Sequence, residues 1–366
     1  MSSNTSFSSP LPFSLADYGW DQARERAFTP HRAGGLLPAR IVRAERGRCE
    51  AVTEMGPVRA VVPFPADATD PLSLPCTGDW VALRPGAAGQ PAMVDTVLER
   101  RTAVVRSTAA RTSHGQVLAA NVDTVVVTVS LADPLKHGRI ERMLALAWES
   151  GAQPVVVLTK ADACADAQAA ASEVSDLAPG ADVLVTSTVT GEGMDTLAAV
   201  LGGTIVLLGP SGAGKSTLGN QLLGQDLLAT GAVRSADGKG RHTTAWREML
   251  PLPGGGVLLD TPGLRAVGLH DAQSGLEQTF AEIEQLAQDC RFTDCGHTGE
   301  PGCAVLHAVE TGLLTQRRLD SYQRLLRENH YAASRTDARV RADRENVKKD
   351  IRRKLRETYT FRERQL

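Results

Sequence analysis

The sequence predicts a multidomain protein with an N-terminal β-barrel, an α/β domain on a parallel sheet, and a mostly helical C-terminal region. From Leu36 to about Arg101, short β-type runs are separated by Gly and Pro, a pattern that fits a small barrel and an unspecialised β-subdomain equally. From Asn121, continuous apolar runs alternate with helical patterns, which indicates a parallel sheet covered on both faces. Beyond about Asp271 only helical patterns follow.

The composition is that of a soluble globular protein. The 366 residues include 42% apolar and 22% charged residues with a net charge of −2, so two or three domains are expected and any basic surface must be local. We expect residues 1–35 to be a flexible lead-in with one helical turn. The N-terminus lacks the pattern of a secretory signal, and no apolar run approaches the ~20 residues that span a bilayer. We therefore expect a cytoplasmic location and no membrane partner.

A phosphate-binding loop follows the apolar run that ends at Leu208. The segment fits G-x-x-x-x-G-K-[ST] between a strand and a helix, which is the context that this motif requires. Its glycines let backbone N–H groups turn toward phosphate oxygens, Lys215 is the catalytic cation for the β- and γ-phosphates, and the Ser216 hydroxyl binds Mg²⁺. The predicted phosphate contacts come from Gly209, Pro210, Ser211, Gly212, Ala213, Gly214, Lys215, Ser216 and Thr217.

A second phosphate motif, Asp260-Thr-Pro-Gly263, ends another apolar run. It matches the D-x-x-G of GTPases, in which Asp260 orients Mg²⁺ through water and the Gly263 N–H senses the γ-phosphate. An ABC-type ATPase would instead show an LSGGQ-like signature and an apolar run ending in Asp-Glu, and the sequence has neither. The two motifs together favour a GTPase.

The base-reading loop precedes the phosphate loop in this chain. Thr159, Lys160, Ala161 and Asp162 form a T-K-x-D segment after a buried strand. The Asp162 carboxylate accepts from guanine N1–H and the 2-amino group, donors that adenine lacks, and Ser187 lies in a second loop expected near the guanine O6. This order is the usual G-domain order rotated, a circular permutation. It runs the D-x-x-G segment directly into the C-terminal region, so we expect nucleotide-dependent motion to be transmitted there.

A polar, Gly-rich segment from Ser235 to Trp246 has the composition of a switch I loop. Thr243 or Thr244 is the expected Mg²⁺ ligand, and the sequence alone does not choose between them. Leu264 follows D-x-x-G, where Ras-type enzymes have a Gln that positions water, so slow intrinsic turnover is expected. His242 is the catalytic candidate for positioning that water; an exposed loop residue that contacts partner RNA fits it equally.

Three cysteines and one histidine lie within a segment of fourteen residues, at Cys290, Cys295, His297 and Cys303. Three thiolates and one imidazole make a closed tetrahedral set, which indicates one structural Zn²⁺ rather than a catalytic one. His307 is a competing ligand on spacing, and we favour His297 because it lies inside the knuckle.

The end of the chain is basic. Residues 317–366 contain sixteen Lys/Arg and eight Asp/Glu, a local net charge of +8 against −10 for the rest. Such a distribution suits phosphate groups of RNA at one end of the molecule, although much of it also fits a solvated helix of mixed charge.

From Leu36 to Leu326, these motifs and their order resemble the RsgA (YjeQ) family of permuted GTPases. The resemblance includes the segment TGDWVAL at 77–83, which matches the family's barrel. It implies an OB-fold at 36–105, a circularly permuted G domain at 115–271 and a zinc-binding helical domain with a basic tail at 272–366.

The resemblance also implies a function. Members of the family act in late maturation of the small (30S) ribosomal subunit, with its 16S rRNA and GTP or GDP as partners, and the subunit stimulates their hydrolysis of GTP. A monomer is expected. The family usually has Asn where this chain has Thr159; a hydroxyl makes only part of the contacts of an amide, so a lower guanine affinity is expected. The alternative is an rRNA-binding scaffold switched by nucleotide with little hydrolysis.

Overall fold

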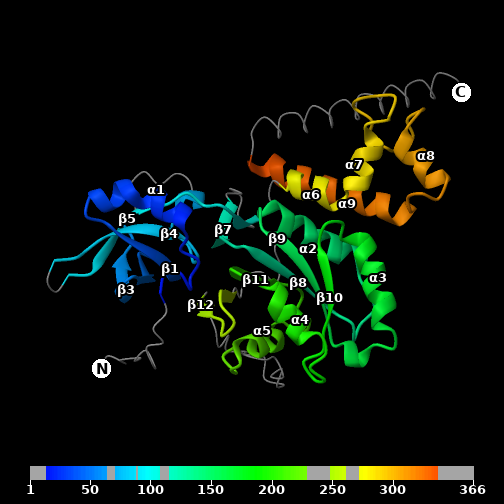
Figure 1. The fold of residues 1–366 in the computed structure, drawn as a ribbon. Helices are drawn as coiled ribbons and strands as arrows, with labels where there is room; N and C mark the ends of the chain where they lie inside the picture. Colours follow the sequence, from blue (N-terminus) through cyan, green and yellow to red (C-terminus); the bar gives the residue numbers. More distant parts are fainter. Residues whose placement is uncertain are drawn as a thin grey trace, which may run out of the picture.

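The computed structural model describes residues 14–63, 71–87, 90–107, 115–228, 248–260 and 272–336. Within these ranges the chain forms a β-barrel, an α/β layer and a group of C-terminal helices, in the order that the sequence predicts (Figure 1). Among the same residues, no helix combines the length and the apolar composition needed to cross a lipid bilayer.

The N-terminal strands close into a barrel. Strand β1 pairs with both β2 and β4, and β3 lies parallel to β5, so the order β1-β2-β3-β5-β4 returns to its start. Fully buried Ala39, Ile41 and Val81 belong to its core. The predicted OB-type barrel is confirmed, with strands β1 (Leu37–Glu45), β2 (Arg48–Thr53), β3 (Gly56–Val61), β4 (Trp80–Arg84) and β5 (Ala92–Val97), and a short helix η1 (Pro71–Ser73) before β4.

Helix α1 (Gln22–Ala33) precedes the barrel, so the prediction of a single helical turn is wrong for this segment. The Asp21 side chain caps the helix by accepting from the Arg24 N–H at 2.7 Å. Phe28 is fully buried, and its ring centroid lies 5.7 Å from that of Trp20. The Asp21 cap and this aromatic contact thus help to fix a helix that is otherwise polar.

The α/β layer is a sheet of order β10-β9-β8-β11-β13-β12, parallel except for β12 against β13. Val125 and Val127 of β8 face the helices α2 and α3, and Val126 faces α4 and α5, as the alternation of a strand requires. The elements are β8 (Thr124–Ser130), α2 (His137–Glu149), β9 (Gln153–Thr159), η2 (Ala161–Ala163), α3 (Ala167–Leu177), β10 (Asp182–Val185), α4 (Met194–Val200), β11 (Thr204–Leu208), α5 (Lys215–Leu223), β12 (Glu248–Pro251) and β13 (Val257–Asp260).

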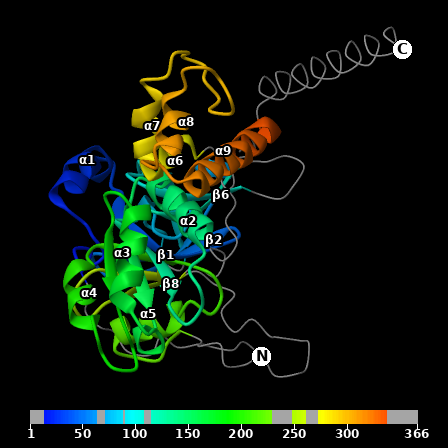
Figure 2. The same ribbon diagram turned by 90° about the vertical axis from the view of Figure 1, so that its right-hand side faces the viewer.

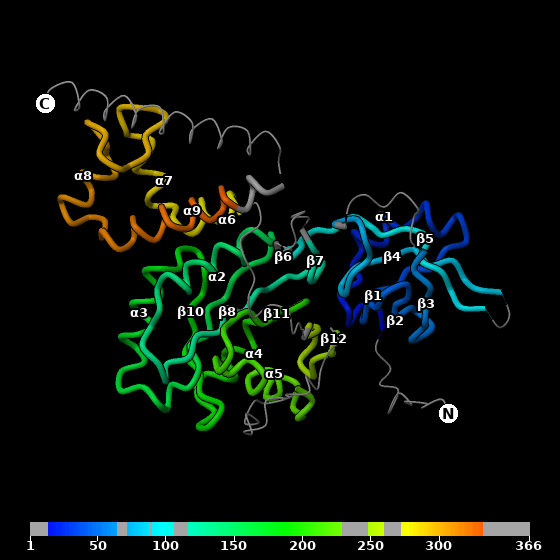
Figure 3. Tube along the Cα trace, turned by 180° about the vertical axis from the view of Figure 1, so that it is seen from behind, coloured from blue at the N-terminus to red at the C-terminus, as the bar shows by residue number. Residues whose placement is uncertain are grey.

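A hairpin, β6 (Ala103–Ser107) with β7 (Gly115–Ala120), lies between the barrel and the sheet (Figure 3). A buried arginine also joins the barrel to the sheet. Arg40 of β1 is 1% exposed. Its guanidinium donates to the Asn121 carbonyl at 3.0 Å and to the Thr204 hydroxyl of β11 at 2.9 Å. It also donates to the carbonyls of Tyr18 and Gly78. Neutral oxygen atoms from both domains thus surround one cation.

The C-terminal helices pack directly on α2 and share its core, which the quarter-turn view shows as a stack of α6 and α9 above α2 (Figure 2). A Cβ added to Gly275 of α6 would lie 2.0 Å from the Ala145 carbonyl oxygen of α2, so only glycine permits this approach. The elements are α6 (Gln273–Thr279), α7 (Ala281–Ala287), α8 (Ala304–Glu310) and α9 (Gln316–Thr336). The prediction of a mostly helical region is confirmed for the described residues.

A fully buried carboxylate lies where α2 meets α9. Glu141 of α2 pairs with Arg317 at 3.0 Å and with Arg318 at 2.9 Å, and it accepts from the Ser321 hydroxyl. Burial alone would raise the pKa of Glu141, but the hydrogen bonds from Ser321, Arg318 and Arg317 outweigh it and the pKa lies below its ordinary value. The carboxylate is therefore ionised in the folded protein.

Arg318 extends this contact into the other helices. Its Nε donates to Glu282 Oε1 at 2.6 Å and its Nη2 donates to the Thr279 carbonyl at 2.6 Å. The guanidinium also lies 4.3 Å from the centroid of the Phe280 ring. One side chain thus links α2, α6, α7 and α9.

We predict that Glu141→Gln lowers the free energy of unfolding by about 3 kcal/mol, because it removes the buried counter-charge of Arg318 and leaves only the partly exposed Glu282 to pair with it. Denaturant unfolding measures the loss. Glu328→Gln, which removes a partly exposed carboxylate paired with Arg142, is the matched control and should cost less than about 1 kcal/mol.

The same pair predicts a pH dependence. Because the folded-state pKa of Glu141 is depressed, its contribution is present above the unfolded-state pKa and is lost as the pH falls through the folded-state pKa. The stability difference between wild type and Glu141→Gln should therefore shrink in acid. A difference that is constant down to full protonation would contradict the role given to the pair.

Candidate nucleotide and zinc sites

The predicted nucleotide-binding segments meet at the carboxyl edge of the parallel sheet. The base loop follows β9, the second base loop follows β10, and the phosphate loop follows β11. Strands β9, β8 and β11 are hydrogen-bonded neighbours, so segments from distant parts of the chain converge there. Ligands of open α/β sheets bind at this edge.

The phosphate loop turns sharply between β11 and α5. Gly212 and Gly214 both have φ of 84°, in the left-handed region that favours glycine. The Lys215 ammonium donates to the carbonyls of Gly209 and Pro210, each at 2.7 Å, which holds the cation against the loop. Ser216 follows in the first turn of α5, where helix N–H groups and the helix dipole favour anions.

The base loop is tied to the phosphate loop by two side chains. The Thr159 hydroxyl donates to the Ala213 carbonyl at 2.8 Å, and the Lys160 ammonium donates to the Gly212 carbonyl at 2.9 Å. Thr159 Oγ1 also lies 3.3 Å from the Val129 carbonyl oxygen of β8. Thr159, which stands where the family usually has Asn, thus still forms a hydrogen bond between the base loop and the phosphate loop.

The two predicted guanine-reading residues touch each other. The Ser187 hydroxyl donates to Asp162 Oδ1 at 2.5 Å and accepts from the backbone N–H groups of Val189 and Thr190 at 3.2 Å. The Ala161 N–H donates to the Thr186 carbonyl at 3.1 Å. These bonds fix the Asp162 carboxylate in place, which a group that selects between two bases needs.

Several predicted residues fall outside the described part of the chain. These are His242, Thr243, Thr244 and Gly263. Asp260 is the last residue of β13, so its backbone lies at the carboxyl edge with the other loops. The donor set that can be named for Mg²⁺, a hydroxyl and a carboxylate, is of the hard-oxygen kind that this ion prefers.

Two cations that the sequence did not single out lie beside the phosphate loop. Lys136 and Arg139 line a cavity of about 230 Å³ together with Ser130 and with residues 210–213. Both belong to the start of α2 and the turn before it. No local motif marks them, because their place beside the loop depends on how β8 and β11 pair.

The four predicted zinc ligands converge. Their ligand atoms all lie within 4.8 Å of one another. His297 Nδ1 lies 3.4 Å from Cys303 Sγ and 3.7 Å from Cys290 Sγ, and the two sulfurs are 3.9 Å apart. Zinc bonds of about 2.3 Å to sulfur and 2.0 Å to nitrogen place tetrahedral ligand atoms about 3.5–3.8 Å apart, so the residues fit this ion.

The competing histidine is not part of this set. The His307 side chain is 74% exposed and lies near Glu310. His297 is buried, and its backbone adopts a φ of 55° that turns the loop back on itself. The Gln323 side chain of α9 donates to the His297 carbonyl at 2.8 Å, which connects the knuckle to the helix whose arginines pair with Glu141.

The loop between these ligands is held by its own carboxylate. Glu300 accepts from the backbone N–H groups of Thr298 at 2.8 Å, Gly299 at 3.0 Å and Gly296 at 3.1 Å. Backbone donors, that of Thr298 foremost, lower the pKa of Glu300 to about 2. The turn around His297 is thus stabilised at neutral pH.

Comparison with known proteins agrees with this geometry. Residues 97–270 match the family model described as RsgA GTPase. A relative from Streptomyces avermitilis, named small ribosomal subunit biogenesis GTPase RsgA, is 58% identical over 344 residues, which cover 93% of this chain and 91% of the relative.

Two solved structures share the fold. YjeQ from Thermotoga maritima is 24% identical with a TM-score of 0.60, over 80% of this chain and 98% of that one. YloQ, described as a circularly permuted GTPase, is 24% identical with a TM-score of 0.56, over 80% of this chain and 94% of that one. With the permuted order of loops and the identity to the named relative over nearly its whole length, the chain belongs to the RsgA GTPase family.

Proposed function

We propose that this chain is a GTPase that acts in late maturation of the small (30S) ribosomal subunit and hydrolyses GTP to GDP and phosphate with stimulation by the subunit. The observation that carries the proposal is the contact between Asp162 and Ser187 beside the phosphate loop. The contact supports the proposal because it holds the Asp162 carboxylate in a fixed position in the base loop, in a chain whose relative is named for small-subunit biogenesis.

In this proposal each nucleotide group has its own protein partners. The guanine is read by Asp162, with Thr159, Lys160, Ala161 and Ser187 shaping the pocket. The phosphates lie in the loop 209–217, where Lys215 offsets their charge. Mg²⁺ would be held by Ser216 and by one of Thr243 and Thr244, with Asp260 orienting it through water; the ion would supply charge neutralisation on the phosphates. Gly263 contacts the γ-phosphate, and His242 positions the attacking water.

The 16S rRNA is the proposed partner on the subunit, and the protein is proposed to act as a cytoplasmic monomer without a membrane partner. The zinc ion would be held by Cys290, Cys295, His297 and Cys303 as a structural ion. Because all four ligand positions come from the protein, the site stabilises the fold of the knuckle rather than performing chemistry.

Asp162→Asn should abolish the preference for GTP over ATP, because the amide presents a donor toward the donor edge of guanine. The affinity for GTP should fall by about 100-fold or more, because the two guanine donors lose their acceptor and each unpaired group costs about 1–3 kcal/mol. Competition by ATP and GTP in a nucleotide-displacement assay measures it. Asp166→Asn, at the cap of α3, is the matched control; equal competition on the wild type would refute the base-reading role.

GTP turnover should be slow for the isolated protein and at least ~10-fold faster with purified small subunits, because a group supplied or positioned in trans can contribute ~10³ or more. Phosphate release measures both rates, with large subunits as the control. Lys215→Ala should remove both activities. If small subunits leave the rate unchanged, the alternative function, an rRNA-binding scaffold switched by nucleotide, is favoured instead.

Cys295→Ser should remove the zinc ion and unfold the knuckle near residues 290–303, since zinc contributes on the order of 10 kcal/mol to small zinc modules. Metal content and co-sedimentation with small subunits should both fall, while nucleotide affinity stays close to wild type. His307→Ala is the matched control and should keep its zinc. Full zinc content in Cys295→Ser would exclude this ligand set.

A further inference from the structure

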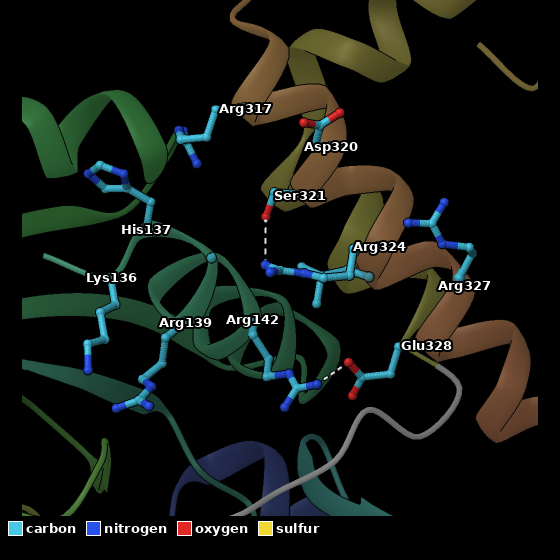
Figure 4. A pocket seen from close by; sticks show the side chains of 12 residues that line it. Lys136, His137, Arg139, Arg142, Arg317, Asp320, Ser321, Arg324, Arg327 and Glu328 are labelled. Carbon is cyan, nitrogen blue, oxygen red and sulfur yellow. Dashed lines mark hydrogen bonds and ion pairs between the residues drawn. The ribbon is translucent and has the colours of Figure 1, made fainter. Parts of the chain in front are cut away.

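A basic groove runs between α2 of the nucleotide-binding domain and α9 of the C-terminal helices (Figure 4). It encloses about 970 Å³ and is lined by residues of both helices. The two helices are in close contact at Gly138 of α2 and Arg324 of α9: a Cβ added to Gly138 would lie 2.1 Å from Arg324 Nη2. The groove therefore exists only while the two domains are packed together.

The charge of the groove is strongly positive. Its two lining carboxylates are Asp320 and Glu328. Glu328 is paired with Arg142, and Asp320 accepts from Gln316 at 2.7 Å. The lining cations are Lys136, Arg139, Arg142, Arg317, Arg324 and Arg327.

Most of these cations are not neutralised by the protein. Arg317 shares the buried Glu141 with Arg318. Arg324 donates to the Ser321 hydroxyl at 3.3 Å, which carries no charge. Among the described residues, Lys136, Arg139 and Arg327 have no ion-pair partner. A cluster of like charges held in a concave surface raises the local concentration of anions.

We infer that this groove binds the phosphodiester backbone of RNA across the junction of the two domains. Guanidinium groups donate in a planar fork that matches phosphate oxygens. Protein interfaces instead have an apolar centre depleted of charge, and Leu325 is the one large apolar residue that lines this groove among the described residues. The inference rests on the proposed function, which supplies an RNA-rich partner, and names the surface that meets it.

The groove also reaches the nucleotide site. Lys136 and Arg139 line both the groove and the smaller cavity beside the phosphate loop. In the close-up their side chains point away from α9, on the opposite side of the first turn of α2 from Arg324 (Figure 4). An RNA backbone bound in the groove thus lies along the helix whose first turn borders the phosphate loop.

The test uses the full chain with Arg324→Gln and Arg327→Gln combined, since both side chains are exposed and lie outside the nucleotide loops. Binding is measured to purified small subunits with a non-hydrolysable GTP analogue, and to a labelled RNA hairpin, at several salt concentrations. Because each lost phosphate contact reduces the slope of log affinity against log salt by about 1, we expect a slope lower by about 2 and binding weaker by at least about 10-fold.

Two further double variants serve as controls. Arg324→Lys with Arg327→Lys keeps the charge and should retain most of the salt slope. Arg26→Gln with Arg46→Gln, two exposed arginines on the N-terminal domain, removes the same charge elsewhere and should change the slope of hairpin binding by less than half as much. An equal decrease of the salt slope in this control, or unchanged binding in Arg324→Gln/Arg327→Gln, would contradict the inference that the groove binds RNA.

The two probes separate this inference from the proposed function. If wild type fails to bind small subunits, the proposed function fails, and the RNA hairpin still decides whether the groove binds RNA. If wild type binds both probes but the groove variant binds them equally well, the groove inference fails while the proposed function stands. Nucleotide affinity of the groove variant, expected to equal that of wild type, shows that its fold is intact.

Discussion

The buried pair of Glu141 and Arg318 is the contact on which the arrangement of the nucleotide-binding and C-terminal regions depends. Two charges without access to water are stable only together, so α9 is fixed relative to α2. Gln323 then fixes the zinc knuckle relative to α9. The permuted order suggested that motion passes from the D-x-x-G segment directly into the C-terminal region. The packing adds a second physical connection, through α2, whose first turn borders the phosphate loop.

The parts of the site that could be predicted are those that local sequence specifies. The phosphate loop needs glycines at fixed spacing, and the zinc knuckle needs four ligands within a short segment, here fourteen residues, so both are visible as motifs. The Glu141–Arg318 contact joins residues 177 positions apart, and no local pattern specifies it. Its one signal was a carboxylate within the apolar segment IERMLALA. The length of helix α1 was underestimated because its buried residues are only Phe28 and the polar Arg24, and β12 was missed because it is a short edge strand.

Thr159 differs from the Asn that is usual in the family, yet it still connects the base loop to the phosphate loop by a hydrogen bond. Its hydroxyl reaches the Ala213 carbonyl, and Lys160 reaches the Gly212 carbonyl. Both bonds run from the base loop to the backbone of the phosphate loop. Because the acceptors are backbone groups, the contact does not depend on which side chains the phosphate loop carries. The base loop and the phosphate loop are therefore held in a fixed relative position by the side chains of Thr159 and Lys160.

The junction between the barrel and the sheet differs in kind from the basic groove. Arg40 is surrounded by carbonyl and hydroxyl oxygens rather than by a carboxylate, and it is excluded from solvent. Dissolved ions screen exposed charges far more than buried hydrogen bonds. Raising the ionic strength therefore removes a polyanion from the surface while the barrel stays docked on the sheet. Purification in concentrated salt should yield a protein that is stripped of nucleic acid yet unchanged in the relative placement of these two domains.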